Sequence, residues 1–244
     1  MCFNISLVKP GEDVSDRFDA VFDRNEGFEP VYHSSAFSLP KHPIICSEDP
    51  ERIRFATWGL IPGWTKDLKS ASSIRLKTLN ARSETVFEKP SFRSAVRENR
   101  CLIPVSGFFE FREVNGKKFP YHIRMKDGRL FSLAGIYEDW EEAPGKKIRT
   151  FSIVTTDANE LMARIHNTKK RMPVVLSKDE ESIWIDVESS IKDLKELLKP
   201  YPGDDLEAYP VSRALSGKNE DSNLPFILEE VDYPELRFKE LDSF

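Results

Sequence analysis

Cys2 is the first candidate for chemistry because it directly follows Met1. If Met1 is removed after synthesis, Cys2 carries a free α-amine and a thiol on adjacent carbons. The reference pKa of such an amine is about 8 and that of the thiol about 8.5, so both groups are partly nucleophilic at neutral pH. The amine can condense with an aldehyde, and the thiol can then close a thiazolidine ring. The alternative is that Cys2 is an inert apolar residue at the start of a strand.

Glu110 and His166 are of the residue types that often transfer protons. Glu110 lies in the apolar run 107–111, on the strand face that also carries Phe108. Loss of water in such a strand raises the pKa of a carboxyl group, whereas a solvent-facing glutamate is the alternative. His166 follows a predicted helix over residues 160–165, whose dipole favours the charged form of its imidazole. Both side chains are therefore candidate proton carriers.

The run 79–85 contains two polar residues that suit a substrate. Arg82 can pair with a phosphate, and the Asn80 amide can bind a substrate oxygen. The alternative is that Asn80 or Ser83 only caps a helix that follows. Both interpretations stay open at this point.

Two tryptophans, Trp58 and Trp64, flank a stiff loop that contains glycine and proline, and basic residues follow it. Such rings can stack on unpaired bases, or they can fill the core. Residues 52–129 contain 17 Lys and Arg against 7 Asp and Glu, a net +10, and the rest of the chain carries 19 against 34, a net −15. A basic middle suits a groove for a phosphate backbone, unless these charges mix with acidic ones in space.

Hydrophobic periodicity predicts the elements that position these residues. Strands are expected over residues 2–8, 52–58, 101–105, 107–111, 119–125, 130–137 and 148–155, and helices over 11–22, 160–165, 178–185 and 191–198. A short helix after Pro90 is expected to point Arg93, Arg97 and Arg100 outward. The pairs Asn115-Gly116 and Asp127-Gly128 predict consecutive hairpins, which indicate an antiparallel sheet. No linker interrupts the pattern, so we expect one domain with a polar, peripheral tail.

Composition narrows the class of protein. The three cysteines, Cys2, Cys46 and Cys101, have no metal-binding spacing and are an odd number, so neither a disulfide framework nor a zinc site is expected. No apolar run reaches the roughly 18 residues of a membrane span, and no secretory signal is recognisable. We expect a cytoplasmic monomer, nucleoid-associated if its source is a prokaryote, without a cofactor.

Five motifs in order resemble the SOS response-associated peptidase (SRAP) family. They are Met1-Cys2, the run 58–64, the run 80–85, residues 100–104 with 107–111, and His166 with Arg171-Met172-Pro173. The resemblance covers residues 1–215 and leaves residues 216–244 as a peripheral tail. It implies an α+β fold, a single domain of twisted, mostly antiparallel sheet with a barrel-like core and flanking helices. It also implies self-removal of Met1 and covalent capture of abasic sites in single-stranded DNA.

The same resemblance implies roles for individual residues. Cys2 resembles the crosslinking nucleophile, Asn80 and Glu110 the groups that position and protonate the opening sugar, and His166 the acid/base. Three further residues look like contacts to the DNA strand; they are Arg82, Arg171 and Trp64.

This chain departs from the family pattern at three places. Phe3-Asn4 follows the cysteine where family members often have Gly-Arg, and Phe111 replaces the usual tryptophan after the strand glutamate. His166 stands five residues before Arg171, whereas the family histidine generally stands two residues before the arginine. Either the extra residues loop out or His166 is displaced.

Two other functions remain open. One is a cysteine peptidase in which Cys2, His166 and Asn80 act on other proteins. The other is a non-catalytic module that binds single-stranded DNA through the basic middle and the tryptophan loop, with a steep salt dependence.

Overall fold

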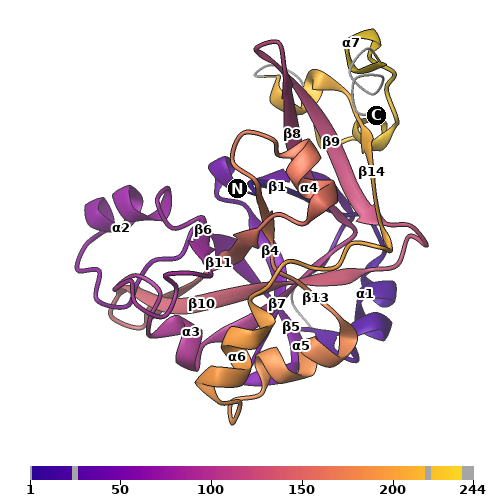
Figure 1. Cartoon of the computed structure of the whole chain (residues 1–244). Helices are drawn as coiled ribbons and strands as arrows, with labels where there is room; N and C mark the ends of the chain where they lie inside the picture. Colours follow the sequence, from indigo (N-terminus) through magenta and orange to yellow (C-terminus); the bar gives the residue numbers. More distant parts are fainter. Residues whose placement is uncertain (1, 24–26, 218–220, 238–244) are drawn as a thin grey trace.

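The structure is a computed structural model that describes residues 2–23, 27–217 and 221–237 (Figure 1). The strands are β1 (Asn4–Leu7), β2 (Val21–Phe22), β3 (Val31–Ser35), β4 (Lys41–Cys46), β5 (Asp49–Trp58), β6 (Asn80–Arg82), β7 (Arg100–Val105), β8 (Gly107–Val114), β9 (Lys117–Met125), β10 (Phe131–Ala143), β11 (Lys146–Asp157), β12 (Arg171–Pro173), β13 (Val175–Leu176) and β14 (Leu206–Pro210). The α-helices are α1 (Gly11–Phe18), α2 (Leu68–Arg75), α3 (Ala95–Glu98), α4 (Glu160–Ile165), α5 (Lys178–Ile185), α6 (Ile191–Leu197) and α7 (Pro234–Arg237). The 3-10 helices are η1 (Ala36–Ser38), η2 (Arg213–Ser216) and η3 (Pro225–Leu228).

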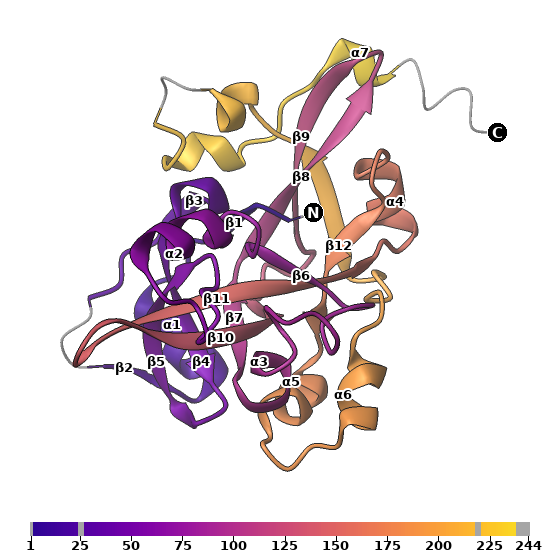
Figure 2. The same ribbon diagram turned by 90° about the vertical axis from the view of Figure 1, so that its left-hand side faces the viewer.

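The strands form two sheets (Figures 1 and 2). The smaller sheet has the order β14-β9-β8-β1-β3, and all its pairings are antiparallel. The larger sheet has the order β12-β11-β10-β7-β4-β5-β2, with β6 beside β11 and β13 beside β10. Parallel pairing occurs where β5 meets β2 and where β11 meets β5 and β6. The expected α+β class with a mostly antiparallel sheet is therefore confirmed.

The larger sheet curls back on itself, because β11 pairs with β10 along one edge and touches β5 along the other. The second contact joins only Thr150 to Thr57 and Phe151 to Trp58. Within the described residues the sheet is not a closed barrel, so the barrel-like core is strongly curved but open.

One of the two predicted hairpins forms. Asn115 and Gly116 adopt positive φ angles of 52° and 75°, and β8 pairs with β9 across this turn. The turn at Asp127-Gly128 also forms, but β9 belongs to the smaller sheet and β10 to the larger one. The second hairpin prediction was wrong, because turn residues specify a local reversal and not the strand that becomes the partner.

Helix α1 is shorter than its apolar pattern predicts. It ends at Phe18, where Asp19 takes the left-handed conformation with a φ of 51°. Val21 and Phe22 then pair in parallel with β5 as the edge strand β2. Two adjacent apolar residues such as Val21 and Phe22 fit either a helix or a strand. This ambiguity explains why the helix was predicted to continue to residue 22.

Arg100 is fully buried and does not point outward as expected. Its Nε donates to the carbonyl of Trp184 at 2.7 Å, and its Nη2 donates to the carbonyl of Asp186 at 2.7 Å. Both carbonyls lie at the C-terminal end of α5, so the guanidinium satisfies acceptors that the helix leaves open.

Helices cover the sheets on the outside. Helix α5 packs against β7, β10 and β13, and α6 packs against α5, whereas α4 contacts β8 and β12. No described helix is long and apolar enough to cross a membrane. In the expected tail, η3 packs against β3 and Ile227 is buried beside Phe109 and Val211, while residues 218–220 and 238–244 lie outside the described part.

Candidate active site

The site residues come from both sheets and meet where the sheets adjoin. Cys2 precedes β1, which pairs with β8, the strand that carries Glu110. Asn80 begins β6, which runs parallel to β11 on the larger sheet. His166 caps the end of α4. These positions, up to 164 residues apart in the sequence, are carried by or adjoin β1, β8, β6 and α4, which lie around the label N in Figure 2.

Cys2 is fully buried among apolar side chains. Its Sγ lies 3.8 Å from the carbonyl oxygen of Asn4, and its own carbonyl accepts a hydrogen bond of 2.9 Å from Asn80 Nδ2. Burial, and then the negative charge of Glu110, raise the pKa of the thiol well above its usual range. In this state the sulfur holds its proton. The expected removal of Met1 concerns a residue outside the described part.

Asn80 does not cap a helix, so that alternative was wrong for it. Its Nδ2 binds the Cys2 carbonyl, whereas its Oδ1 is buried and has no hydrogen-bond partner among the described residues. A buried acceptor that lacks a donor is unfavourable by about 1–3 kcal/mol. The asparagine therefore offers a buried acceptor beside Cys2.

Glu110 is almost completely buried in β8, and its side chain lines a cavity. Burial raises the pKa of its carboxyl group to about 7, in the direction that the apolar strand predicts. At neutral pH the carboxyl group thus exists in both protonation states, which is the condition for giving and taking a proton efficiently.

His166 lies beside Glu110, with 3.6 Å between the imidazole Nδ1 and Glu110 Oε1. Its Nδ1 is 2.9 Å from the carbonyl oxygen of Arg171, which only accepts, so we assign the proton to Nδ1 and the acceptor role to Nε2. Burial lowers the imidazole pKa to about 4. The expected bias toward the charged form was wrong, because loss of water outweighs the dipole of a six-residue helix.

The longer spacing between His166 and Arg171 is taken up by an exposed turn. Lys170 adopts a positive φ of 49° and donates from its backbone to the His166 carbonyl at 2.7 Å. Asn167 fixes this turn to β8: its Oδ1 accepts from the Glu113 backbone at 3.0 Å, and its Nδ2 donates to the Glu113 carbonyl at 2.8 Å. The extra residues loop out, and His166 remains beside Glu110.

Arg171 and Arg82 differ in their availability. The Arg171 guanidinium is buried and bound by the carboxylates of Glu84 and Asp157 and by the Thr155 carbonyl. Arg82 is exposed, lines the same cavity and makes no ion pair within the described residues. Arg82 is therefore available to a phosphate, whereas Arg171 first supports the cavity wall.

We call this hollow the site cavity; its volume is about 620 Å³. Its wall consists of Phe3, Asn4, Arg82, Glu84, Glu110, Phe111, Glu113, Lys118, Asp157, His166, Thr168, Lys169 and Arg171. The wall contains four basic side chains, from Arg and Lys, and four carboxyl groups, from Glu and Asp. The charge of the cavity wall is therefore mixed and not uniformly positive. Cys2 is buried and is not part of this wall, but it directly precedes Phe3, which is.

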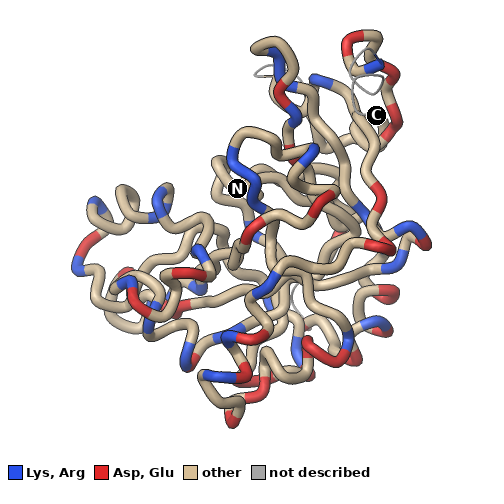
Figure 3. Tube along the Cα trace, in the orientation of Figure 1, with Lys and Arg blue, Asp and Glu red and all other residues tan. Residues whose placement is uncertain are grey.

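The basic middle of the sequence is spread over both sheets, and Figure 3 shows basic and acidic positions interspersed over the molecule. Of the two tryptophans, Trp58 is fully buried and stacks on Phe151 with 5.7 Å between ring centroids, so it fills the core. Trp64 is 58% exposed, and its Nε1 donates to the Pro90 carbonyl at 3.2 Å.

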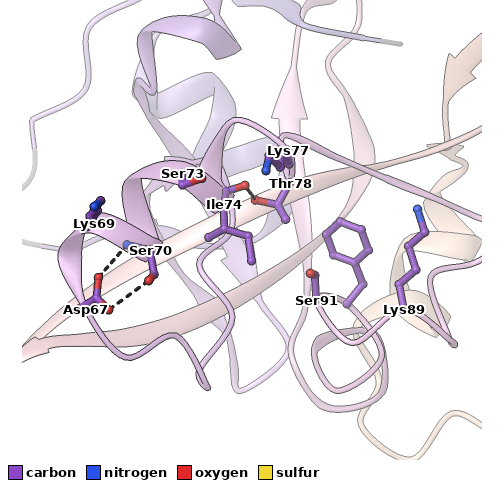
Figure 4. A pocket seen from close by; sticks show the side chains of 10 residues that line it. Asp67, Lys69, Ser70, Ser73, Ile74, Lys77, Thr78, Lys89 and Ser91 are labelled. Atoms are coloured by element: carbon purple, nitrogen blue, oxygen red, sulfur yellow. Dashed lines mark hydrogen bonds between the residues drawn. The ribbon is translucent and has the colours of Figure 1, made fainter.

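A second hollow, which we call the lysine cavity, has a volume of about 760 Å³. Figure 4 shows Lys69 and Ser70 of α2 on one side and Lys89 and Ser91 on the other, with Lys77 between them. The carboxylate of Asp67 is occupied in capping α2 through Ser70.

Several residues at the site received no role from the sequence. Glu84 and Asp157 bind Arg171, and Lys118 and Thr168 line the cavity. Glu84 lies within a recognised motif, but its partner is 87 residues away, so only the fold reveals the pairing.

Comparison with known proteins finds relatives along most of the chain. The family model described as SOS response associated peptidase (SRAP) matches residues 1–217. The abasic site processing protein YoaM of Bacillus subtilis is 39% identical over 229 residues, which are 92% of this chain and 97% of YoaM. The abasic site processing protein YoqW of the same organism is 38% identical, over 94% of this chain and 99% of YoqW.

A crystal structure of a protein from Bacteroides thetaiotaomicron has the same fold. Its TM-score is 0.88 at 38% identity, and the match covers 94% of this chain and all of that chain. With a family model over most of its length and relatives of this similarity, the chain belongs to the SOS response associated peptidase (SRAP) family.

Proposed function

We propose that this protein processes abasic sites in single-stranded DNA by forming a thiazolidine crosslink through Cys2, after it has removed Met1. The observation that carries the proposal is the hydrogen bond of 2.9 Å from Asn80 to the Cys2 carbonyl, beside a glutamate whose pKa is about 7. The relatives named abasic site processing proteins support the same reaction class.

Removal of Met1 is the first step. Hydrolysis of the bond between Met1 and Cys2 consumes one water, releases methionine and leaves the amine of Cys2. Asn80 holds the carbonyl on the other side of Cys2, and we assign the base to Glu110, since its charge acts on the thiol. Because the sulfur otherwise keeps its proton, a neighbouring base is required before it can react.

Capture of the sugar follows in three steps. An abasic deoxyribose is mostly a closed hemiacetal, and opening moves a proton from its C1′ hydroxyl to the ring oxygen; Glu110 and the neutral imidazole of His166 serve this transfer. The Cys2 amine then attacks C1′ and releases one water as the imine forms. Finally the sulfur adds to the imine carbon and the thiol proton moves to nitrogen, which closes the ring.

A peptidase that acts on other proteins has less support. The relatives are named abasic site processing proteins, and a protein substrate would have to bring a whole peptide chain to the fully buried Cys2.

Intact-mass measurement tests the proposal. The purified protein is expected to lack one methionine, and after mixing with an abasic single strand it gains the mass of the strand minus one water. Cys2→Ala is expected to form no denaturant-resistant adduct, whereas Cys46→Ala, which removes a buried thiol outside the site, still forms it. An undiminished adduct with Cys2→Ala, or an adduct on protein that retains Met1, would overturn the mechanism.

A further inference from the structure

Two buried histidines of the smaller sheet hold its N-terminal strand. His33 of β3 and His122 of β9 each make a hydrogen bond to a side chain of β1, and we call this pair the histidine clamp. We propose that the histidine clamp fixes the register of β1 on β8 and thereby positions the amine and the thiol of Cys2 for reaction. This inference deepens the proposed function and rests on it.

His122 reaches β1 across the intervening strand β8. It lies opposite Phe109 of β8, and its Nε2 extends over Gly107 to the Ser6 hydroxyl, at 3.1 Å. A Cβ atom at Gly107 would collide with this nitrogen, so the position requires a glycine. On the other side of the ring, Nδ1 lies 3.0 Å from the Tyr209 hydroxyl of β14. One side chain therefore connects the four neighbouring strands β14, β9, β8 and β1 (Figure 1).

The protons of this hydrogen-bonded chain follow from its last acceptor. Ser6 Oγ lies 3.3 Å from the Gly107 carbonyl, which only accepts, so we assign the hydroxyl proton to that bond. Ser6 then accepts from Nε2 of His122, and Nδ1 accepts from the Tyr209 hydroxyl. Burial lowers the pKa of the imidazole to about 3, so the ring is neutral, as this assignment requires. Every donor has an acceptor, a condition under which a buried polar network specifies one arrangement.

His33 holds the residue at which β1 begins. Its Nε2 lies 2.9 Å from Asn4 Oδ1, an oxygen that only accepts, so the nitrogen donates. The carbonyl oxygen of Asn4 is in turn the contact of the Cys2 sulfur. Both imidazoles pack on the ring of Phe109, with 5.5 Å between ring centroids for His33 and 4.8 Å for His122. The two histidines therefore belong to one packed unit beside the nucleophile.

Main-chain pairing alone does not secure the register of so short a strand. β1 has four residues and pairs with β8 at three positions. A slip by one residue is prevented by burial, because it would turn Ile5 and Leu7 out of the core. A slip by two residues keeps the alternation and would move Cys2 by about 7 Å along the strand direction, relative to Glu110. The histidine clamp opposes this slip, and it opposes fraying of a chain end that begins at Cys2 once Met1 is removed.

Such a role predicts an effect on the reaction step and not on strand binding. A misplacement of reacting groups by about 1 Å can slow a reaction about 100-fold. His122 does not line the site cavity, so a change at this residue leaves the contacts of that wall with the strand in place. His122 is therefore a positioning residue, and its variants are expected to change the crosslinking rate at saturating strand without changing the half-saturating concentration.

Two amide substitutions separate the hydrogen bonds of His122. The amide nitrogen of a glutamine occupies about the place of Nε2 in a histidine, whereas that of an asparagine occupies about the place of Nδ1. His122→Gln therefore keeps a donor to Ser6, and His122→Asn loses it. On a saturating abasic single strand, His122→Asn is expected to crosslink about tenfold more slowly than the wild type, the factor that one buried hydrogen bond controls. His122→Gln is expected to recover most of the rate.

A second variant tests the same bond from β1. Ser6→Ala is expected to slow crosslinking as His122→Asn does, and the double variant is expected to be no slower than either single one, because both remove one interaction. Rates are divided by the fraction of protein that lacks Met1, measured by intact mass, so that incomplete processing is not counted as slow chemistry. If His122→Asn does not fold, Ser6→Ala still decides.

His42 provides a matched control in the larger sheet. It is buried in β4, and its Nε2 donates to the Pro104 carbonyl at 2.8 Å. His42→Asn loses this donor as His122→Asn loses its own, so it is expected to lower the melting temperature and to keep the wild-type crosslinking rate. Equal slowing by His42→Asn and His122→Asn would reduce the clamp to a general effect on stability and overturn its positioning role.

Other contrary results are equally specific. Equal rates for His122→Asn and His122→Gln, or a raised half-saturating concentration at an unchanged maximal rate, would overturn the inference. Amide hydrogen exchange measures the clamp without any crosslinking: His122→Asn is expected to speed exchange in β1 and to leave β11 unchanged. Unchanged exchange in β1 would also overturn it. Absence of any adduct with the wild type contradicts the proposed function only, since hydrogen exchange still decides whether the clamp holds β1.

Discussion

Nδ1 of His166 lies 3.6 Å from Oε1 of Glu110, and the two groups have pKa values that burial shifts in opposite directions. The carboxyl group titrates at about 7 and the imidazole at about 4. Near neutral pH the pair therefore consists of a neutral imidazole and a carboxyl group that is partly protonated. Of the two, only Glu110 changes its protonation state in the physiological range.

Replacing Glu110 by Gln is expected to slow crosslinking by about 100-fold or more, the usual effect of removing a general acid or base. The amide keeps the size of the side chain but cannot exchange a proton. Single-turnover rates on an abasic strand measure the change. The crosslinking rate of the wild type is expected to change with pH around 7, where Glu110 titrates. The residual rate of the variant is expected not to change with pH in this range. An unchanged pH profile in the variant would exclude Glu110 as the titrating group.

Glu110 is also expected to make stability depend on pH. Its folded-state pKa of about 7 lies above the ordinary value of 4.5, so the folded state binds the proton more tightly. The resulting stabilisation is complete below pH 4.5 and is lost as pH rises through 7; it is on the order of 3 kcal/mol, since one pKa unit corresponds to about 1.4 kcal/mol. Urea unfolding of wild type and Glu110→Gln between pH 5 and 8 measures it. Equal pH dependence of the two proteins would contradict the raised pKa.

The two arginines of the site cavity are expected to behave differently when each is changed to Ala. Arg82→Ala removes an exposed cation, so it should weaken noncovalent DNA binding and reduce the salt slope by about 0.7, without lowering the melting temperature. Arg171→Ala removes a buried guanidinium that joins Glu84 to Asp157, so it should lower the melting temperature by several degrees. Calorimetry and salt-dependent anisotropy separate the two effects. A stable Arg171→Ala protein with the same salt effect as Arg82→Ala would assign both residues to phosphate binding.

Trp64 and Trp58 form a second matched pair. Trp64→Ala should weaken binding of single strands by about 1–3 kcal/mol if the exposed ring stacks on a base, and it should leave unfolding unchanged. Trp58→Ala should destabilise the fold by about 3–5 kcal/mol, because it opens a cavity in the core. Denaturant unfolding and anisotropy measure the two quantities. If Trp64→Ala binds single-stranded DNA with the same affinity as the wild type, the DNA does not contact Trp64.

Local patterns predicted the strand that carries Glu110 and the helix that ends at His166, because alternation and capping depend on neighbouring residues. They did not predict features that depend on distant partners. Arg100 is buried because carbonyls more than 80 residues away accept its hydrogen bonds. Likewise, burial lowers the pKa of the His166 imidazole, and the Glu110 side chain 3.6 Å from it belongs to a strand that is distant in the sequence. The separation of β9 from β10 has the same origin, since strand choice is a property of the whole sheet.

The double hydrogen bond between Asn167 and the backbone of Glu113 has an evolutionary consequence. These two hydrogen bonds attach the turn after α4 to β8. The packing of α4 on β8 therefore sets the position of His166, and the number of residues between His166 and Arg171 does not. A change in the length of the turn between the two residues then need not move His166 away from Glu110. A search for remote members of the family should accordingly let this gap vary in length.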